Sequence, residues 1–154
     1  MPTYIREAEL IYRRRKTPQD ASEPAFTTVR CSGDVAPIAR SLIGSRLTES
    51  LIVFALDGKN KLVGFHEVAR GSTTACPVLP ADVFRYPLIA GAVSFILAHN
   101  HPSGDVTPSH EDRVITQRIV EASALLGLRM LDHLIVSDEC FYSFLDAGEI
   151  GSRS

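Results

Sequence analysis

The chain has 154 residues, a hydrophobic content of 45% and a formal net charge of −2 at pH 7. This length fits a single domain with a substantial core, and the balanced charge excludes a strong overall attraction to nucleic acid or anionic lipid. The sequence has neither the apolar core of a signal peptide nor a membrane-spanning segment, and its three cysteines form no C-x-x-C pair. We therefore expect a cytoplasmic protein without membrane contact.

Residues 1–30 are predicted to form an N-terminal strand and a flexible connection. Residues 4–15 have the mixed pattern of an exposed strand, and the residues after them are rich in proline, serine and acidic side chains. A basic cluster from Arg13 to Lys16 could contact phosphates, although a short basic run is more often a solvated strand end. Contact with nucleic acid therefore stays open. The folded domain is predicted to occupy residues 31–154.

The first half of this domain is predicted to contain a helix and a strand hairpin. Residues 32–44 begin with capping residues and end at a glycine, as short helices do. Apolar residues then dominate two runs at 49–57 and 61–71. The Asp57-Gly58 pair between these runs is a strong hairpin signal, so the two runs are predicted to be paired strands.

The second half alternates helices with strands. A helix over 80–92 precedes an apolar run at 92–100, which is bounded by glycine and proline and therefore predicts a buried strand. Residues 109–128 have the clearest helical pattern, with these apolar side chains along one side: Val114, Ile115, Ile119, Val120, Ala124 and Leu125. Two further strands are predicted over 131–138 and 140–146.

This order of elements predicts an α/β (α+β) fold, in which a mixed, mainly antiparallel sheet packs against flanking helices. The runs at 49–57 and 140–146 are interpreted as apolar edge strands. Such edges can pair between two copies of a chain, so a homodimer is considered.

The segment FILAHNHPSGDVTPSHEDR, residues 95–113, carries a candidate metal site. In an extended chain residues i and i+2 face the same way, so His99 and His101 project together at the end of the buried strand. The next helix is predicted to start at Ser109, which brings Asp112 into its first turn. Two imidazoles and one carboxylate are a zinc-type ligand set that leaves a fourth corner for water. The plainer alternatives are a hydrogen-bonded histidine pair and a Ser109–Asp112 capping box.

A hydrolytic zinc site needs a base for the proton of its water, and Glu67 is the preferred candidate over Asp57 and Asp105. Glu67 alternates with apolar residues along its strand, where desolvation would raise the pKa of Glu67 toward a range useful for proton transfer. The alternative is a surface salt bridge on an edge strand. His133 could support the ligands, but it is interpreted as a buried core histidine.

The segment ILAHNHPSGDVTPSHEDR resembles the JAMM (MPN+) metalloprotease motif, with seven residues between the second histidine and Ser109 and two between Ser109 and Asp112. From about Leu47 to Asp146 the chain looks like the RadC family of that superfamily. The resemblance implies a JAB/MPN fold related to cytidine deaminases for residues 31–154. It also implies Zn²⁺ bound by the two histidines and Asp112, Glu67 as general acid and base, and Ser109 as the oxyanion donor. The implied activity is a zinc metallopeptidase acting on a peptide or isopeptide bond in a peptide or protein substrate.

Other functions remain as alternatives. The family name is associated with DNA repair, so a non-catalytic or nucleic-acid-linked module is the main alternative. Longer members of the family carry a helix-hairpin-helix DNA-binding region before this domain, and no such motif precedes Leu47 here. A nuclease is disfavoured because the HNH nuclease motif does not place its residues consecutively. A zinc deaminase is disfavoured because the H-x-E and P-C-x-x-C elements are absent.

Overall fold

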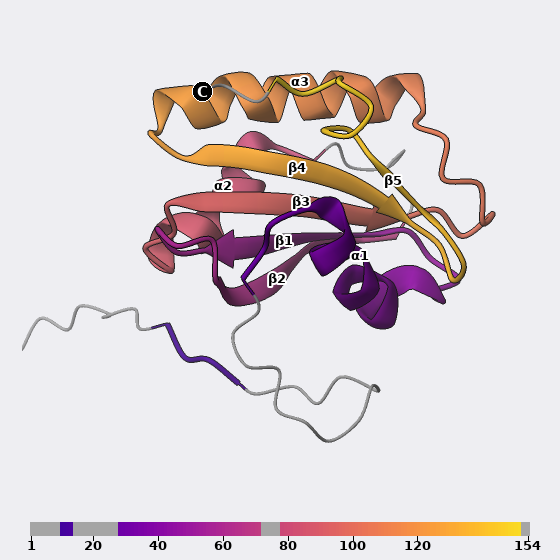
Figure 1. Ribbon diagram of the computed structural model, residues 1–154, viewed down its shortest axis with the longest axis horizontal. Coiled ribbons are helices and arrows are strands. Elements are labelled where there is room, and N and C mark those ends of the chain that lie inside the picture. The colour runs from indigo at the N-terminus through magenta and orange to yellow at the C-terminus, as the bar shows by residue number, and fades with distance from the viewer. Residues whose placement is uncertain (1–9, 14–27, 72–77, 152–154) are drawn as a thin grey trace, which may run out of the picture.

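The computed structural model describes residues 10–13, 28–71 and 78–151. Its five strands form one sheet in the order β2-β1-β3-β4-β5, in which only β3 and β4 pair in parallel (Figure 1). The mixed, mainly antiparallel α/β fold predicted from the sequence is therefore confirmed. The bounds are α1 Ser32–Ala39, the π-helical turn η1 Arg40–Gly44, β1 Ser50–Leu56, β2 Leu62–Arg70, α2 Pro80–Ile89, β3 Ser94–Asn100, α3 His110–Leu125, β4 Arg129–Val136 and β5 Phe141–Ser143.

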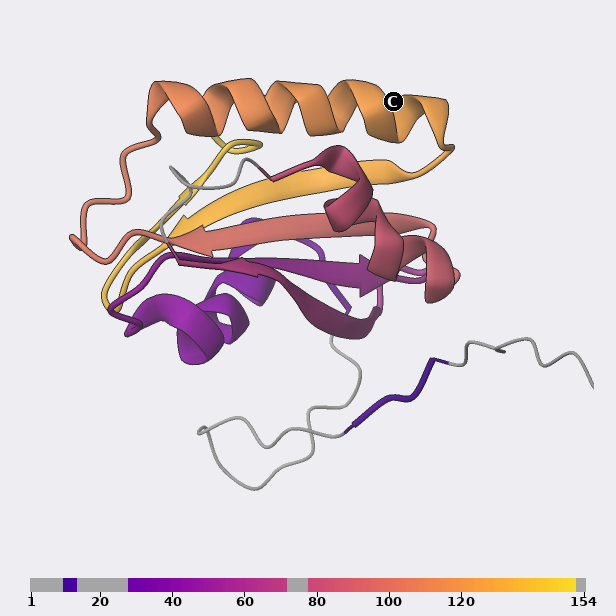
Figure 2. The ribbon, with the colours of Figure 1, turned by 180° about the vertical axis from the view of Figure 1, so that it is seen from behind.

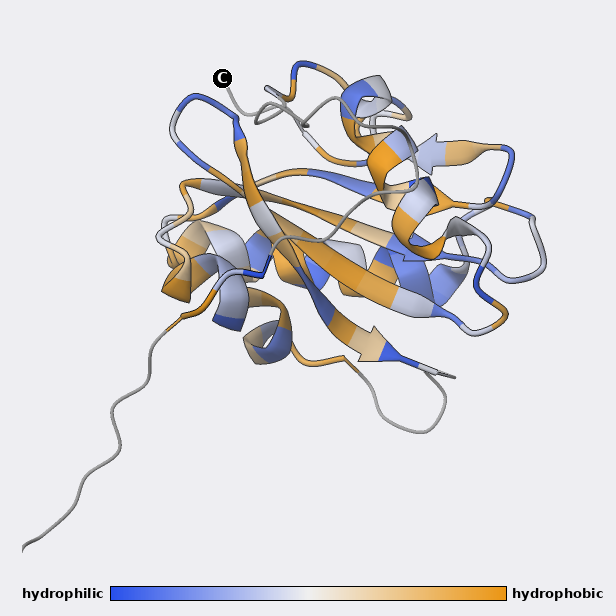
Figure 3. Cartoon of the chain, turned by 90° about the horizontal axis from the view of Figure 1, so that it is seen from below, coloured by the Kyte–Doolittle hydropathy of each residue, from blue (hydrophilic) through white to orange (hydrophobic). Residues whose placement is uncertain are grey.

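Helices cover both faces of the sheet. On one face α2 and α3 bury residues such as Phe84 and Ile119 against Phe95 and Leu97 of β3. On the other face α1 buries residues such as Val35 against the alternate side chains of β1 and β3. Figures 1 and 2 show α1 and α2 on opposite sides of the sheet. In Figure 3 the strands are largely orange and the turns between them largely blue, as expected for a sheet buried on both sides.

The predicted hairpin is confirmed, but one predicted edge strand is not an edge. The side-chain oxygen of Asp57 accepts hydrogen bonds from the backbone N–H groups of Lys59 and Lys61, which closes the turn between β1 and β2. β1 lies between β2 and β3, so its backbone is paired on both sides. The expectation that residues 49–57 could pair with a second copy was therefore wrong, whereas β5 does lie at the end of the strand order.

Helix α3 forms where predicted, and its buried side agrees with the predicted one in part, because Ile119 is buried and Ile115 and Val120 pack against the core. Val114 and Leu125 are 44% and 91% exposed, whereas Thr116, Ile119 and Ser123 are buried. The rest of the apolar pattern was misleading because two hydroxyl residues that bond back to helix carbonyls occupy the inner side. This difference brings Thr116 toward the sheet.

Only part of the predicted N-terminal strand lies within the described residues. Residues 10–13 are not in a strand, and the remaining residues of 4–15 lie outside the described ranges, as do the last three residues of the Arg13–Lys16 cluster. In the part of the chain that the structure describes, no helix combines the length and apolar character that crossing a membrane requires.

Candidate metal centre

The last residues of β3 bring two imidazoles to one face of the sheet. β3 is fully buried, and Leu51 of β1 lies opposite His99 in an antiparallel ladder. In an antiparallel ladder, a step backward on one strand matches a step forward on the other. Two steps from the Leu51–His99 pair therefore put Glu49 opposite His101. The backbone N–H of Gly71 donates to the carbonyl oxygen of Glu49 at 2.8 Å, which continues the strand pairing to this residue. Glu49 therefore shares the face of both histidines.

Asp112 comes from the first turn of α3 and is fixed by the cap of that helix. The backbone N–H of Ser109 donates to Asp112 Oδ2 at 2.8 Å, and the N–H of Asp112 donates to Ser109 Oγ at 3.0 Å. Two free amides at the helix start are satisfied in this way. The capping box and the position beside the histidines therefore exist together, since Asp112 uses both of its oxygens.

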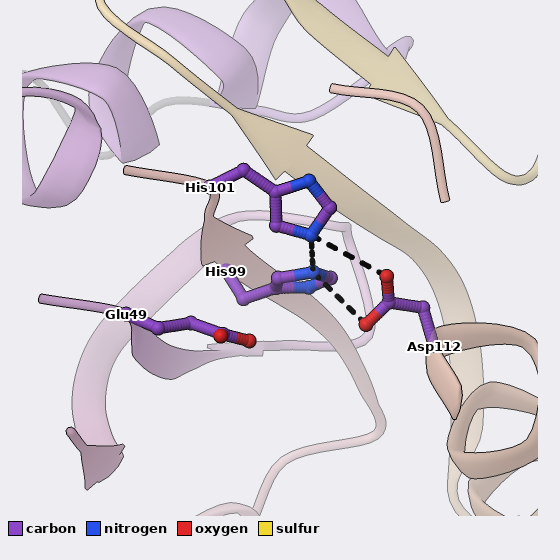
Figure 4. Close-up of side chains that lie close together, drawn as sticks. All are labelled: Glu49, His99, His101 and Asp112. Carbon is purple, nitrogen blue, oxygen red and sulfur yellow. Dashed lines mark hydrogen bonds and ion pairs between the residues drawn. The ribbon is translucent and has the colours of Figure 1, made fainter. Parts of the chain in front are cut away.

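His99, His101, Asp112 and Glu49 form a compact group in which one ligand atom from each lies within 4.8 Å of the others (Figure 4). The Nε2 atoms of His99 and His101 are 3.0 Å apart, and they lie 3.2 Å and 3.4 Å from the two oxygens of Asp112. In Figure 4 the dashed lines join these three residues, and the Glu49 carboxylate lies beside them. The three predicted ligands are thus brought together.

The spacing of these donors fits a small divalent cation. Ligands held tetrahedrally at the usual zinc distances are roughly 3.3 Å from one another, close to the three separations observed. His101 Nδ1–H donates to the carbonyl oxygen of Asp105 at 2.7 Å, so its Nε2 is left with a lone pair. A lone pair and a carboxylate that converge on one point favour a cation there. The residues present therefore fit zinc, the metal that such an N/O ligand set suits.

Ionisation of the group follows from its contacts. Burial opposes the charge on Asp112, but its hydrogen bonds with His101 and His99 outweigh burial and hold the pKa of Asp112 well below its usual range. The contact with Asp112 in turn raises the pKa of His101. Burial lowers the pKa of His133, which lies behind His99, well below its ordinary value. Asp112 is therefore a carboxylate in the metal-free protein, and a metal ion bound at His101 would displace the proton that this contact favours.

Glu67 does not join this group, contrary to what was expected of the base. It lies opposite Ile52 of β1, whose side chain packs on the α1 face of the sheet, away from His99. Arg70 Nε donates to Glu67 Oε1 at 2.6 Å and Arg46 Nη1 donates to Oε2 at 3.0 Å. The hydrogen bond from Arg70 lowers the pKa of Glu67, so the expected rise is wrong, and the salt-bridge alternative describes this residue.

Ser109 keeps a hydroxyl hydrogen for another partner. Its oxygen accepts from Asp112, and among the described residues no acceptor is bonded to its own hydrogen. Ser109 is exposed and directly precedes the first turn of α3, which carries Asp112. A cleft of about 280 Å³ adjoins the group at His101 and is also lined by Arg46, Ser103 and Cys140. A larger cavity of about 850 Å³, between α1, α3 and β4, contains none of the four clustered residues.

The fold and the convergent donor set define an α/β domain with a candidate metal site. A family model described as the RadC-like JAB domain matches residues 29–149, and the chain belongs to that family. This confirms the resemblance found in the sequence.

Curated proteins give the same result. The chain is 44% identical over 100 residues to a UPF0758 protein of Geotalea uraniireducens, covering 65% of this chain and 44% of that one. It is 41% identical over 117 residues to a UPF0758 protein of Moorella thermoacetica, covering 76% and 51% of the two chains. A UPF0758 protein of Desulforamulus reducens is 36% identical over 132 residues, covering 84% and 58%. The chain thus spans about half the length of the curated relatives it matches.

Proposed function

We propose that this domain is a zinc-dependent hydrolase of the JAMM type that cleaves a peptide or isopeptide bond. The observation that carries the proposal is the convergence of His99, His101 and Asp112 with a further carboxylate, Glu49, beside them. Three nitrogen and oxygen ligands with one open position are typical of catalytic zinc, whereas structural zinc takes four protein ligands. Glu49 is therefore interpreted as a reacting group and not as a fourth ligand.

Each of these side chains has a role in the proposed reaction. Zinc bound by His99, His101 and Asp112 would supply a Lewis acid for the substrate carbonyl and an activated water. Glu49, in place of Glu67, would take a proton from the activated water on its carboxylate and return it to the leaving amine. Ser109 donates its free hydroxyl hydrogen to the oxyanion that forms on the substrate. Loss of one such donor costs on the order of 10²–10³ in rate.

The cleft beside His101 supports a substrate that approaches along the surface. It is lined by hydroxyl, charged and backbone groups, as a site for a polar backbone would be. His101, one of the proposed ligands, lines this cleft together with Arg46 and Ser103, so a peptide backbone lying in the cleft would pass beside the group. We therefore favour an amide in a peptide or protein over a small apolar substrate.

The test compares three zinc-loaded proteins on a peptide library read by mass spectrometry. The wild type and Glu67→Gln are expected to cleave, whereas Glu49→Gln is expected to keep its zinc and lose cleavage. Glu67→Gln is the matched control, because it removes the same charge on the opposite face of the sheet. Equal cleavage by the wild type and Glu49→Gln would overturn the role of Glu49. Full zinc loading without cleavage by the wild type would favour the non-catalytic alternative.

A further inference from the structure

Two residues outside the proposed ligand set connect its buried histidine to the helix that carries Asp112. His99 Nδ1 lies 2.8 Å from His133 Nε2, and His133 Nδ1 lies 2.6 Å from Thr116 Oγ1. Thr116 Oγ1 lies 2.6 Å from the carbonyl oxygen of Asp112. His133 and Thr116 are 1% and 3% exposed, so water does not compete for these contacts. An unbroken chain of short hydrogen bonds thus runs between two proposed zinc ligands.

The donor and the acceptor of each hydrogen bond in this series can be derived from its last acceptor, the carbonyl oxygen of Asp112. A carbonyl oxygen has no hydrogen, so the hydroxyl of Thr116 must donate to Asp112. A hydroxyl has one hydrogen, and Thr116 must therefore accept the bond from His133 Nδ1–H. His133 is fully buried and stacks on Phe144 with ring centroids 5.0 Å apart, surroundings that favour the neutral imidazole.

The same reasoning extends to the metal side. A neutral His133 with its hydrogen on Nδ1 has a lone pair on Nε2, so it must accept from His99 Nδ1–H. His99 then has its own lone pair on Nε2, the atom that lies beside His101 and Asp112. If His133 Nε2–H instead donated to His99 Nδ1, the hydrogen of His99 would be on Nε2 and would exclude a cation from that nitrogen.

We propose that His133 and Thr116 are positioning residues that hold the hydrogen of His99 on Nδ1 and keep Nε2 free for the metal. This inference rests on the proposed zinc site and adds to it two residues that touch neither the ion nor the substrate. Thr116 does not contact His99. It determines the tautomer of His99 through two successive hydrogen bonds, with His133 between them. It also joins the orientation of His99 to the helix turn of Asp112, so both ligands are held in one arrangement. Such outer partners typically account for 10–100-fold in metal affinity.

The test measures zinc affinity by competition with a chromophoric chelator, without any substrate. Thr116→Val keeps the shape of the side chain and removes the acceptor for His133, and we expect zinc affinity to fall by about 10–100-fold. Thr116→Ser restores the hydroxyl and is expected to bind zinc within a few-fold of the wild type. Ser123→Ala is the matched control, because it removes a buried α3 hydroxyl that, among the described residues, bonds to the Val120 carbonyl and to no residue of the metal group.

A second pair of variants covers the case in which Thr116→Val does not fold. In His133→Gln the side-chain amide oxygen can accept from His99 Nδ1–H, whereas His133→Met leaves only a weak thioether acceptor. Zinc affinity is expected to be higher in His133→Gln than in His133→Met. Equal affinity in this pair, or wild-type affinity in a folded Thr116→Val, overturns the inference while leaving the proposed zinc site intact. A wild type that binds no zinc overturns the proposed function itself.

Discussion

The side chain of Asn100 holds Ser50 in place, since its Oδ1 accepts a hydrogen bond from the Ser50 backbone N–H at 2.7 Å. The Asn100 amide nitrogen donates to the carbonyl oxygens of Arg46 and Thr48, each at 3.2 Å. Asn100 is fully buried on the face opposite to the neighbouring histidines. Glu49 lies between two of these anchored residues, so the amide that separates the histidines in the sequence also fixes the backbone of the proposed base.

Asn100→Ala is expected to reduce turnover far more than zinc affinity. The substitution leaves one N–H and two carbonyl groups without their buried partner, and the free energy of unfolding should fall by about 1–3 kcal/mol. Glu49 then loses its fixed position, whereas His99 and His101 keep their own contacts. Urea unfolding, chelator competition and peptide cleavage measure the three quantities. A parallel loss of zinc affinity and turnover would contradict this assignment.

Zinc is expected to stabilise the wild type against heat. At a free zinc concentration 100-fold above its dissociation constant, binding to the folded state adds about 2.7 kcal/mol to the free energy of unfolding. His99→Ala removes one ligand and should abolish the response. His110→Ala is the matched control, because His110 is an exposed residue at the start of α3 and lies outside the group. Thermal unfolding with and without zinc distinguishes the variants, and an equal response in His99→Ala would contradict the ligand assignment.

Asp112 is expected to contribute to zinc binding and to helix stability separately. Asp112→Asn removes the charge and its pairing with His101, but it keeps an oxygen that can accept from the Ser109 N–H, so it should weaken zinc binding while the helix cap is retained. Asp112→Ala loses both functions, and the metal-free free energy of unfolding should also fall by about 0.5–2 kcal/mol. Metal analysis and urea unfolding check the two effects. A fully zinc-loaded Asp112→Ala protein would count against Asp112 as a ligand.

Glu67→Gln is expected to lower stability at neutral pH by at most about 1 kcal/mol, because Glu67 and its arginine partners are partly exposed. The folded-state pKa of Glu67 lies below its ordinary value. Its contribution is therefore present above the unfolded pKa and is lost as pH falls through the folded one. Urea unfolding of both proteins at neutral and acidic pH measures this difference. A stability gap that persists below the folded pKa would contradict the ion-pair role.

The sequence was sufficient for those parts of the site that depend on local geometry. His99 and His101 are two residues apart at the end of a strand, and Asp112 is at a definite position after a helix cap. Strand alternation and helix capping each act over a few residues, so their consequences can be derived without knowing the rest of the fold.

The other residues of the site depend on how distant segments pair. Alternation correctly put Glu67 on the side of Phe65, but it does not tell which face of the sheet that side becomes. Glu49 reaches the histidines only through the register between β1 and β3. The sequence signal for Glu49 was a glutamate directly before an apolar strand. This signal does not indicate a role in the site until the register between the strands is known.

Two predictions about partners stay predictions. β5 ends the strand order and could pair with a second copy, which light scattering at two protein concentrations would test. Contact of the Arg13–Lys16 cluster with nucleic acid is open to a binding assay at two salt concentrations.

The two histidines of the group are held by unlike surroundings. His99 is bonded to the buried His133, whereas the partly exposed His101 is bonded to a carbonyl in the exposed turn that ends at Asp105. Movement of that turn can release His101 while His99 and the sheet stay in place. The metal ion could then leave without unfolding of the domain. A chelator should therefore remove zinc much faster than the domain unfolds.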